Sequence, residues 1–562
     1  MTKIWADTIL SGGKVVTMDA AGTVAEAIAI SGSRIRTVGS ADEIAALRGP
    51  ATVVTPLEGR IVVPGIIDTH AHMEREGLKT LRPSLASARC IGDILAIVTA
   101  TAQTKAPGDW VVTMPVGQPP FYFGGPGTLA EGRMPNRFEL DRAAPDHPVC
   151  IAGVFCNWGE PPGYTAMNSR ALSLLGIDRN TPPAGPGVEI EHDPASGEPT
   201  GIIVERNNRP TIDFSLLGGI TGFDFAERMT GLRRSMAAYN AVGTTSVYEG
   251  HGSAPETIAV YRQLWQQREL TVRARLCVSP PWENVQEGAR AMRDWLAYGR
   301  GRGLGDEWLR VGGIFIGFAG SEQVACACRA ALPNTGWTGF IEWSHSLDEF
   351  RQYARLAAEY DLRLNTIVGD HLDAILGVLE EIDSHLPLSG RRWVIEHPRR
   401  ITPIQIKRIG RLGLHVTTIP VYTIWKNGGA LTRAMSVEEI DDYVPHAALL
   451  GAGVRASAGT DNIPYNPFFT IQTLVTREER KSGGKIAARQ AVTRLQALRL
   501  MTADAAYITF EEDCKGTLDA GKFADLAVLS GDFFGVQDSA LGEITSALTM
   551  VGGVIVHRSP AL

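Results

Sequence analysis

A short stretch after residue 60, IVVPGIIDTHAHME, places two histidines at the end of an apolar run. His70 and His72 are separated by one residue, and Asp68 precedes them. Because successive side chains of a strand alternate between its faces, a strand through this stretch would point both imidazoles the same way. Imidazole is a common ligand of divalent zinc and iron. The stretch therefore predicts either a metal site or two exposed histidines at a strand end, with Asp68 capping the loop.

Two distant stretches end in a similar way. WVIEHPRR closes an apolar run with His397, and VRASAGTDNIPYNP closes another with Asp461. A single histidine in such a place is more often a core residue held by hydrogen bonds. Three polar endings of this kind in one chain favour the convergence of these side chains at a common metal site.

The middle of the chain supplies elements that would position these residues. Helix-like runs alternate there with short apolar runs, which is the β/α pattern of a parallel sheet. Eight strands can be counted if IVVPGIIDTH is the first and VCIAGVF, residues 149–155, serves as the second. The predicted fold class is therefore α/β, a (β/α)8 TIM-like barrel whose active site lies at the carboxyl ends of the strands.

The two ends of the sequence show a different residue pattern, with short β-like segments and glycine turns such as TILSGGKVV and SALTMVGGVIVHRS. They predict a small β-sandwich built from residues 1–63 and 506–562, with the barrel at 64–505. A long Pro- and Gly-rich insertion, about 107–215, interrupts the barrel pattern, and we expect it to lie over the barrel mouth. Its aromatic residues either form an apolar substrate wall or pack a core of the insertion itself: Trp110, Phe121, Tyr122, Phe123 and Trp158.

The bulk composition is that of a globular protein. The chain has 562 residues, 44% of them apolar, and a net charge of -7, which gives no support to a nucleic-acid or membrane partner. It has neither a signal-peptide core nor an apolar run of membrane-spanning length, so we expect a soluble cytoplasmic protein. Seven scattered cysteines predict reduced thiols, and we interpret Cys326 and Cys328 as structural because helix positions two apart face different ways.

Several blocks of the sequence resemble the metal-dependent amidohydrolase superfamily, in the expected order and across nearly the whole chain. They are PGIIDTHAH, IEHPRRITPIQ, SAGTDNIP and GTLDAGKFADLAVL. Segments such as TAMNSRALSLLGI, AVGTTSVYE and TIVGDHLDAILGVLEE are similar to its family 3 branch of N-substituted formamide deformylase-like and YtcJ-like proteins. The resemblance implies a barrel beside a small β-sandwich, a homodimer, and hydrolysis of an amide, N-formyl or N-acyl bond in a small, partly apolar substrate.

The sequence departs from the family pattern on two strands. Phe315 stands where a bridging lysine is common on the fourth strand, and Ala319 stands where an aspartate is usual. Thr366, or Asn365 if the register slips by one, stands at the usual fifth-strand histidine. Phenylalanine cannot bridge two cations and threonine is a poor ligand, so we expect one divalent ion, zinc with iron or manganese as alternatives.

The ligand set that remains is His70, His72, His397 and Asp461. A metal ion there would acidify its water, and Asp461 would accept the proton and pass it to the leaving nitrogen. His397 either binds the ion directly or contacts only its water and helps to stabilise the oxyanion, so Asp461 and His397 are the predicted catalytic residues.

Other readings stay open at this point. Glu249 and His251 follow a strand and either enter the site or lie on a surface loop. His371 either replaces the missing fifth-strand ligand or starts a helix with Asp370 as its N-cap. The alternative functions are a deaminase, a non-hydrolytic lyase on the same metal barrel, or a non-catalytic relative, because a fold does not fix a reaction.

Overall fold

The computed structural model describes residues 5–207, 211–218, 220, 222–294, 296–318, 320–342 and 344–560. The chain forms two compact units. Unit 1 consists of Met1–Met73, Arg233–Ala319 and His345–Leu562, and unit 2 of Glu74–Leu232 and Gly320–Ser344. All four predicted ligands belong to unit 1.

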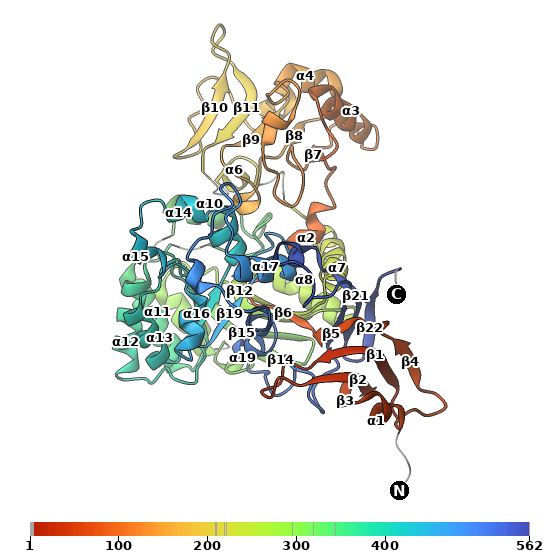
Figure 1. Ribbon diagram of the computed structural model, residues 1–562. Helices are drawn as coiled ribbons and strands as arrows, with labels where there is room; N and C mark the ends of the chain where they lie inside the picture. The colour runs from red at the N-terminus through yellow and green to blue at the C-terminus, as the bar shows by residue number, and fades with distance from the viewer. Residues whose placement is uncertain are drawn as a thin grey trace. The chain divides into compact units, whose positions relative to one another are not determined.

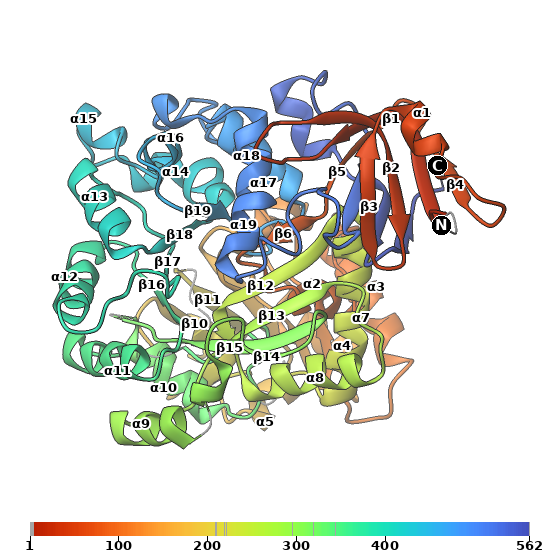
Figure 2. The same cartoon turned by 90° about the horizontal axis from the view of Figure 1, so that it is seen from below.

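Unit 1 is built around a parallel sheet whose strands follow one another in chain order (Figure 2). Within the described ranges these strands are β6 (Ile66–Asp68), β12 (Thr244–Ser253), β13 (Arg273–Val278), β15 (Leu309–Phe315), β16 (Leu364–Ile367), β17 (Val394–Glu396), β18 (His415–Thr418) and β19 (Ala456–Ala458), with the short β14 (Leu304–Gly305) antiparallel to β15. The expected (β/α)8 TIM-like barrel is confirmed.

The barrel closes at the carboxyl ends of its first and last strands. The backbone N–H of Asp461 donates to the carbonyl of His70 at 2.7 Å, and the N–H of Thr460 donates to the carboxylate of Asp68 at 3.0 Å. Two of the residues that join these strands, His70 and Asp461, are therefore also candidate ligands.

The prediction for the second strand was wrong. Val149–Ile151 forms β8, which pairs with strands of unit 2, and the second barrel strand is β12. A short apolar run such as VCI has the same composition in either sheet, so its composition alone does not assign it to one of them.

Amphipathic helices cover the outside of the barrel, and α11 shows why they form there. Ser346 and Glu349 make a reciprocal capping box at its first turn, and Phe350, Tyr353 and Ala357 recur at helical spacing on its buried face. The helices that belong wholly to unit 1 are α1 (Ala41–Ala45), α8 (Pro255–Gln266), α9 (Val285–Asp294), α11 (Leu347–Glu359), α12 (Leu372–Asp383), α13 (Pro403–Leu412), α14 (Gly428–Leu431), α15 (Val437–Ile440), α16 (His446–Gly451), α17 (Pro467–Thr476), α18 (Arg494–Leu500) and α19 (Ala503–Ile508).

The two ends of the sequence form one mixed sheet, seen in Figure 1 as red strands beside dark blue ones. Its strands are β1 (Thr8–Val16), β2 (Val24–Ser31), β3 (Arg34–Gly39), β4 (Val53–Pro56), β5 (Ile61–Pro64), β20 (Leu526–Leu529), β21 (Ser546–Val551) and β22 (Val554–Arg558). The central strand β5 pairs in parallel with β1 and antiparallel with β20. Their buried aliphatic side chains make a core of their own.

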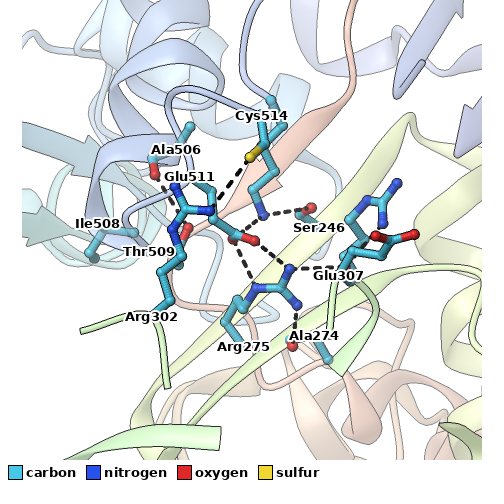
Figure 3. A network of polar contacts seen from close by, with 12 residues as sticks. Ser246, Ala274, Arg275, Arg302, Glu307, Ala506, Ile508, Thr509, Glu511 and Cys514 are labelled. Atoms are coloured by element: carbon cyan, nitrogen blue, oxygen red, sulfur yellow. Dashed lines mark hydrogen bonds and ion pairs between the residues drawn. The ribbon is translucent and has the colours of Figure 1, made fainter. Parts of the chain in front are cut away.

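A buried ion cluster joins the barrel strand β13 to the segment after α19 (Figure 3). Glu511 accepts from Nε of Arg275 at 2.8 Å and pairs with Nζ of Lys515, also at 2.8 Å. Lys515 in turn donates to the hydroxyl of Ser246 on β12 at 3.1 Å. One carboxylate thus neutralises two cations inside unit 1.

Unit 2 contains a separate mixed sheet, labelled in Figure 1, that the sequence analysis did not predict. Its strands are β7 (Val111–Thr113), β8 (Val149–Ile151), β9 (Gly163–Met167), β10 (Val188–His192) and β11 (Pro199–Glu205). Its helices are α2 (Glu74–Lys79), α3 (Ile91–Ala102), α4 (Arg137–Ala143), α5 (Ser169–Leu174), α6 (Thr211–Ser215) and α10 (Glu322–Ala330), and α7 (Phe225–Ala241) crosses the unit boundary.

The aromatic residues of unit 2 contribute to its own packing. Trp158 is 1% exposed and packs edge-on against Trp337, with ring centroids 5.2 Å apart. Tyr122 is buried, and its ring lies 6.5 Å from that of Trp158. Among the insertion's aromatic residues, Tyr122 and Trp158 therefore fit the interpretation as core residues.

All seven cysteines are free thiols. Cys326 is exposed and Cys328 is buried on α10, so the two sulfurs face different ways, as expected. In the described parts of the chain, every helix is too short or too polar to cross a bilayer.

Candidate metal centre

The four predicted ligands converge at the carboxyl ends of β6, β17 and β19. Nε2 of His70 lies 3.0 Å from Nε2 of His397 and 3.9 Å from Oδ1 of Asp461. Nε2 of His72 lies 3.3 Å from the same carboxylate oxygen. The rings of His70 and His72 meet edge to face, with centroids 4.9 Å apart. Residues separated by almost 400 positions therefore present donor atoms to one small volume.

An unusual backbone produces this convergence. His72, His397 and Asp461 have φ angles of 47°, 55° and 54°, in the left-handed region that side chains other than glycine seldom adopt. β6 ends at Asp68, so His70 and His72 face each other through a bend rather than through the expected alternation along a strand. Such conformations cost about 1–3 kcal/mol each and cluster at functional sites.

A buried carboxylate orients His70. Its Nδ1 lies 3.2 Å from Oε2 of Glu396, and both side chains are fully buried. Burial alone would lower the pKa of His70, but the neighbouring carboxylates, led by Glu396, outweigh it and raise the pKa. With Nδ1 directed at a carboxylate, Nε2 is the nitrogen that faces the other candidate ligands.

His397 has the opposite electrostatic environment. Burial, followed by the positive charges of His70, His251 and Arg399, lowers its pKa well below the ordinary value. It is therefore neutral at pH 7 and keeps a lone pair on one ring nitrogen. A neutral imidazole is the form that binds a metal ion.

The donor atoms fit a divalent cation. Two facing ring nitrogens only 3.0 Å apart, as in His70 and His397, need a proton or a cation between them because their lone pairs repel. Ligand atoms of a tetrahedral zinc site with bonds of about 2.0–2.1 Å lie about 3.3 Å apart. The distances of 3.0, 3.3 and 3.9 Å among the four side chains bracket that value.

From the sequence, Glu249 and His251 could either enter the site or lie on a surface loop. Both belong to β12, at this end of the barrel. The carboxylate of Glu249 accepts from the backbone N–H groups of His72 and Met73, each at 2.9 Å, and so supports the left-handed turn at His72. His251 can share one ion with His70 and His72, since their ligand atoms lie within 4.8 Å of one another. Of these two, His251 is the additional candidate ligand.

The fifth strand resolves the register that the sequence left open. Asn365 is fully buried and bonds Glu396, and the hydroxyl of the buried Thr366 makes no hydrogen bond among the described residues. Phe315 ends β15 and packs against His251, with ring centroids 4.6 Å apart. Ala319 lies outside the described residues. Asn365 is thus the residue that projects toward the site.

The structure also places Asp68, His371 and Asp370, three residues that the sequence left open. The carboxylate of Asp68 accepts hydrogen bonds from the N–H groups of His70 and Thr460, so it holds the loop in place. Burial raises the pKa of Asp68 to about 7.

His371 is exposed and is itself the N-cap position of α12, so the interpretation of Asp370 as the N-cap was wrong. Asp370 instead pairs with Arg399 at 2.8 Å.

Glu396 was not among the site residues predicted from the sequence. It precedes His397 directly, and strand alternation would put the two side chains on opposite faces. The left-handed backbone of His397 breaks that alternation and allows both to face inward. The only signal in the sequence was the position of an acidic residue inside an apolar run, VIEH.

The model of the amidohydrolase family, family 3, matches residues 54–557. The chain belongs to the amidohydrolase family. It is a metal-dependent hydrolase of carbon–nitrogen bonds other than peptide bonds, as the sequence analysis predicted.

Relatives of this amidohydrolase match it over nearly its whole length. An N-substituted formamide deformylase of Arthrobacter pascens is 27% identical over 98% of both chains. The putative amidohydrolase YtcJ of Bacillus subtilis (strain 168) is 24% identical over 99% of this chain and 100% of its own. The crystal structure of an uncharacterized metal-dependent hydrolase from Pyrococcus furiosus, 19% identical, superposes with a TM-score of 0.67 over 94% of this chain and 99% of its own, which shows a shared fold.

Proposed function

We propose that this amidohydrolase cleaves an amide, N-formyl or N-acyl bond of a small, partly apolar molecule at a single divalent ion. The observation that carries the proposal is the convergence of His70, His72, His397 and Asp461, with three donor distances between 3.0 and 3.9 Å. The name of the Arthrobacter relative, an N-substituted formamide deformylase, supports an N-formyl substrate.

The residues of this chain would divide the chemistry as follows. A divalent ion held by these ligands would lower the pKa of a water molecule from about 16 towards about 7. The carboxylate of Asp461, beside the histidine rings, accepts the proton of that water. The water oxygen would add to the carbonyl carbon of the substrate. The same carboxylate would then deliver the proton to the leaving nitrogen as the carbon–nitrogen bond breaks, because an amine without a proton is a poor leaving group. The neutral His397 completes the ligand set.

The ligand set predicts the metal content of the protein. Elemental analysis of the purified chain should give about one equivalent of divalent metal, zinc in our proposal, and His397→Ala should lower it because one donor is lost. His371→Ala is the matched control, since that histidine is exposed on the same rim and should leave the content unchanged. Two equivalents in the wild type would contradict the single-ion proposal and point to His251 as a further ligand.

The reaction class predicts the product. With a panel of N-formyl, N-acyl and amino-heterocycle substrates, we expect release of formate or another carboxylate together with an amine. Ammonia release from heterocycles alone would favour a deaminase, and carbon dioxide release would favour a lyase. The resemblance implies that a deaminase has a fifth-strand histidine followed, a few residues on, by a glutamate that shuttles the proton. Asn365 and Thr366 stand at the place of that histidine and the segment TIVGDH has no such glutamate, which argues for the hydrolytic product.

Two finer points belong to the same proposal. Seven free thiols suit a reducing compartment, so we place the protein in the cytoplasm. We also propose a homodimer, which light scattering of the purified protein would test by its mass in solution.

A further inference from the structure

A buried amide lies behind the candidate metal centre. Asn365, on β16, is fully buried and has several hydrogen-bond partners. Its Nδ2 donates to Oε1 of Glu396 at 3.1 Å and to the carbonyl of Gly250 at 3.0 Å. Its Oδ1 accepts from the hydroxyl of Tyr248 at 2.8 Å. Both amide protons and one lone pair of the oxygen are thus used, which leaves this side chain little freedom to turn.

The carboxylate of Glu396 connects this amide to a candidate ligand. Its Oε1 is held by Asn365, and its Oε2 lies 3.2 Å from Nδ1 of His70. Tyr248, Asn365, Glu396 and His70 are all fully buried. They form a chain of polar contacts from β12 across β16 and β17 to the turn after β6, with the candidate metal ligand at its end.

The backbone of β12 is shaped to admit this carboxylate. A Cβ atom at Gly250 would lie 2.1 Å from Oε1 of Glu396 and 3.2 Å from Nδ2 of Asn365. Only glycine leaves room for these two side chains to meet at that point. This close approach is independent of the hydrogen bonds and points to the same fixed position for Glu396.

We propose that Asn365 and Tyr248 are positioning residues for the metal centre: they hold Glu396 against Nδ1 of His70, so that His70 offers Nε2 to the cation. This inference rests on the proposed function. A histidine can bind a metal through either nitrogen, and a carboxylate at one of them fixes both the tautomer and the ring orientation. Asn365 bonds Glu396 and is thereby kept from acting as a fifth-strand ligand.

The test measures the affinity of the metal-free full-length protein for Co²⁺ by competition with a chelator. Asn365→Leu keeps a similar side-chain volume but cannot hold Glu396, and we expect it to weaken Co²⁺ binding about 10–100-fold. Tyr248→Phe removes one oxygen and should weaken binding severalfold. Ser246→Ala is the matched control, because it removes a buried hydroxyl of the same strand that bonds Lys515 instead.

The visible absorption of bound Co²⁺ separates positioning from a general loss of stability. At saturation, Asn365→Leu and Tyr248→Phe should change the band intensities, since a reoriented His70 alters the ligand geometry, whereas Ser246→Ala should keep the wild-type spectrum. If Asn365→Leu does not fold, the Co²⁺ affinity and spectrum of Tyr248→Phe alone decide whether the inference holds. Wild-type affinity and spectrum in the folded positioning variants would overturn this inference and leave the proposed function standing. A wild-type protein that binds no Co²⁺ would overturn both.

Discussion

Replacing Asp461 with asparagine is expected to lower kcat/KM by about 10²–10⁴-fold, the usual contribution of a general base. Asparagine can still present an oxygen to a cation from the same left-handed position, but it cannot accept and return a proton. Metal content should therefore fall much less than turnover. The measurement is steady-state hydrolysis of the best N-formyl or N-acyl substrate, together with elemental analysis of the same preparation.

Asp370→Asn provides the control for this substitution. Asp370 follows the fifth barrel strand, but it is exposed and pairs with Arg399 rather than with a candidate ligand. The substitution Asp370→Asn makes the same chemical change as Asp461→Asn without touching the proposed base, so turnover should stay at the wild-type level. An Asp461→Asn protein that keeps wild-type turnover would remove Asp461 from the mechanism.

Replacing Glu511 with glutamine is expected to lower the free energy of unfolding by about 3–5 kcal/mol, the usual effect of breaking a buried ion pair from one side. Glu511 neutralises Arg275 and Lys515, and all three side chains are at most 3% exposed. Burial already lowers the pKa of Lys515 to about 8 with this carboxylate beside it. Without the carboxylate, two buried cations would face each other. Urea unfolding followed by circular dichroism measures the difference.

A surface variant serves as the control for Glu511→Gln, and both variants are compared with the wild type over a range of pH. Asp513→Asn breaks the neighbouring pair with Arg302, whose members are 64% and 39% exposed, and should change stability by less than about 0.5 kcal/mol. Burial would raise the pKa of Glu511, but its cationic partners outweigh burial and lower it. Its contribution is therefore complete above the unfolded pKa of about 4.3 and is lost as the pH falls below it. A stability gap that did not narrow in acid would contradict this assignment.

The barrel could be predicted because its strands are apolar runs that end in polar residues. IVVPGIIDTH and WVIEH have this form, and each indeed ends at the site. The order of the strands was harder, because VCI in unit 2 and a barrel strand are both short apolar runs. Burial on both faces removes the alternation that would tell two such sheets apart, as Val111 and Val112 on neighbouring positions show.

The identities of the candidate ligands could be read from the sequence, but their orientation could not. It depends on positive φ angles at His72, His397 and Asp461, none of which is a glycine. Tertiary contacts hold these angles, such as the carboxylate of Glu249 on the N–H groups of the turn at His72. Glu396, the partner of His70, was missed for a related reason, because it comes from another strand and meets His70 only in the folded barrel.

The position of β5 in the terminal sheet has a consequence for synthesis of the protein. Val62 pairs with Val528, so β5, which directly precedes the first barrel strand, pairs with a strand that is translated only after all the barrel strands. Until then the edge of β5 that pairs with β20 has no native neighbour. Long-range pairings of this kind fold late and are exposed to aggregation. We therefore expect the terminal sheet to be completed only after β20 has been translated, and to depend on chaperones when the chain is made at high level.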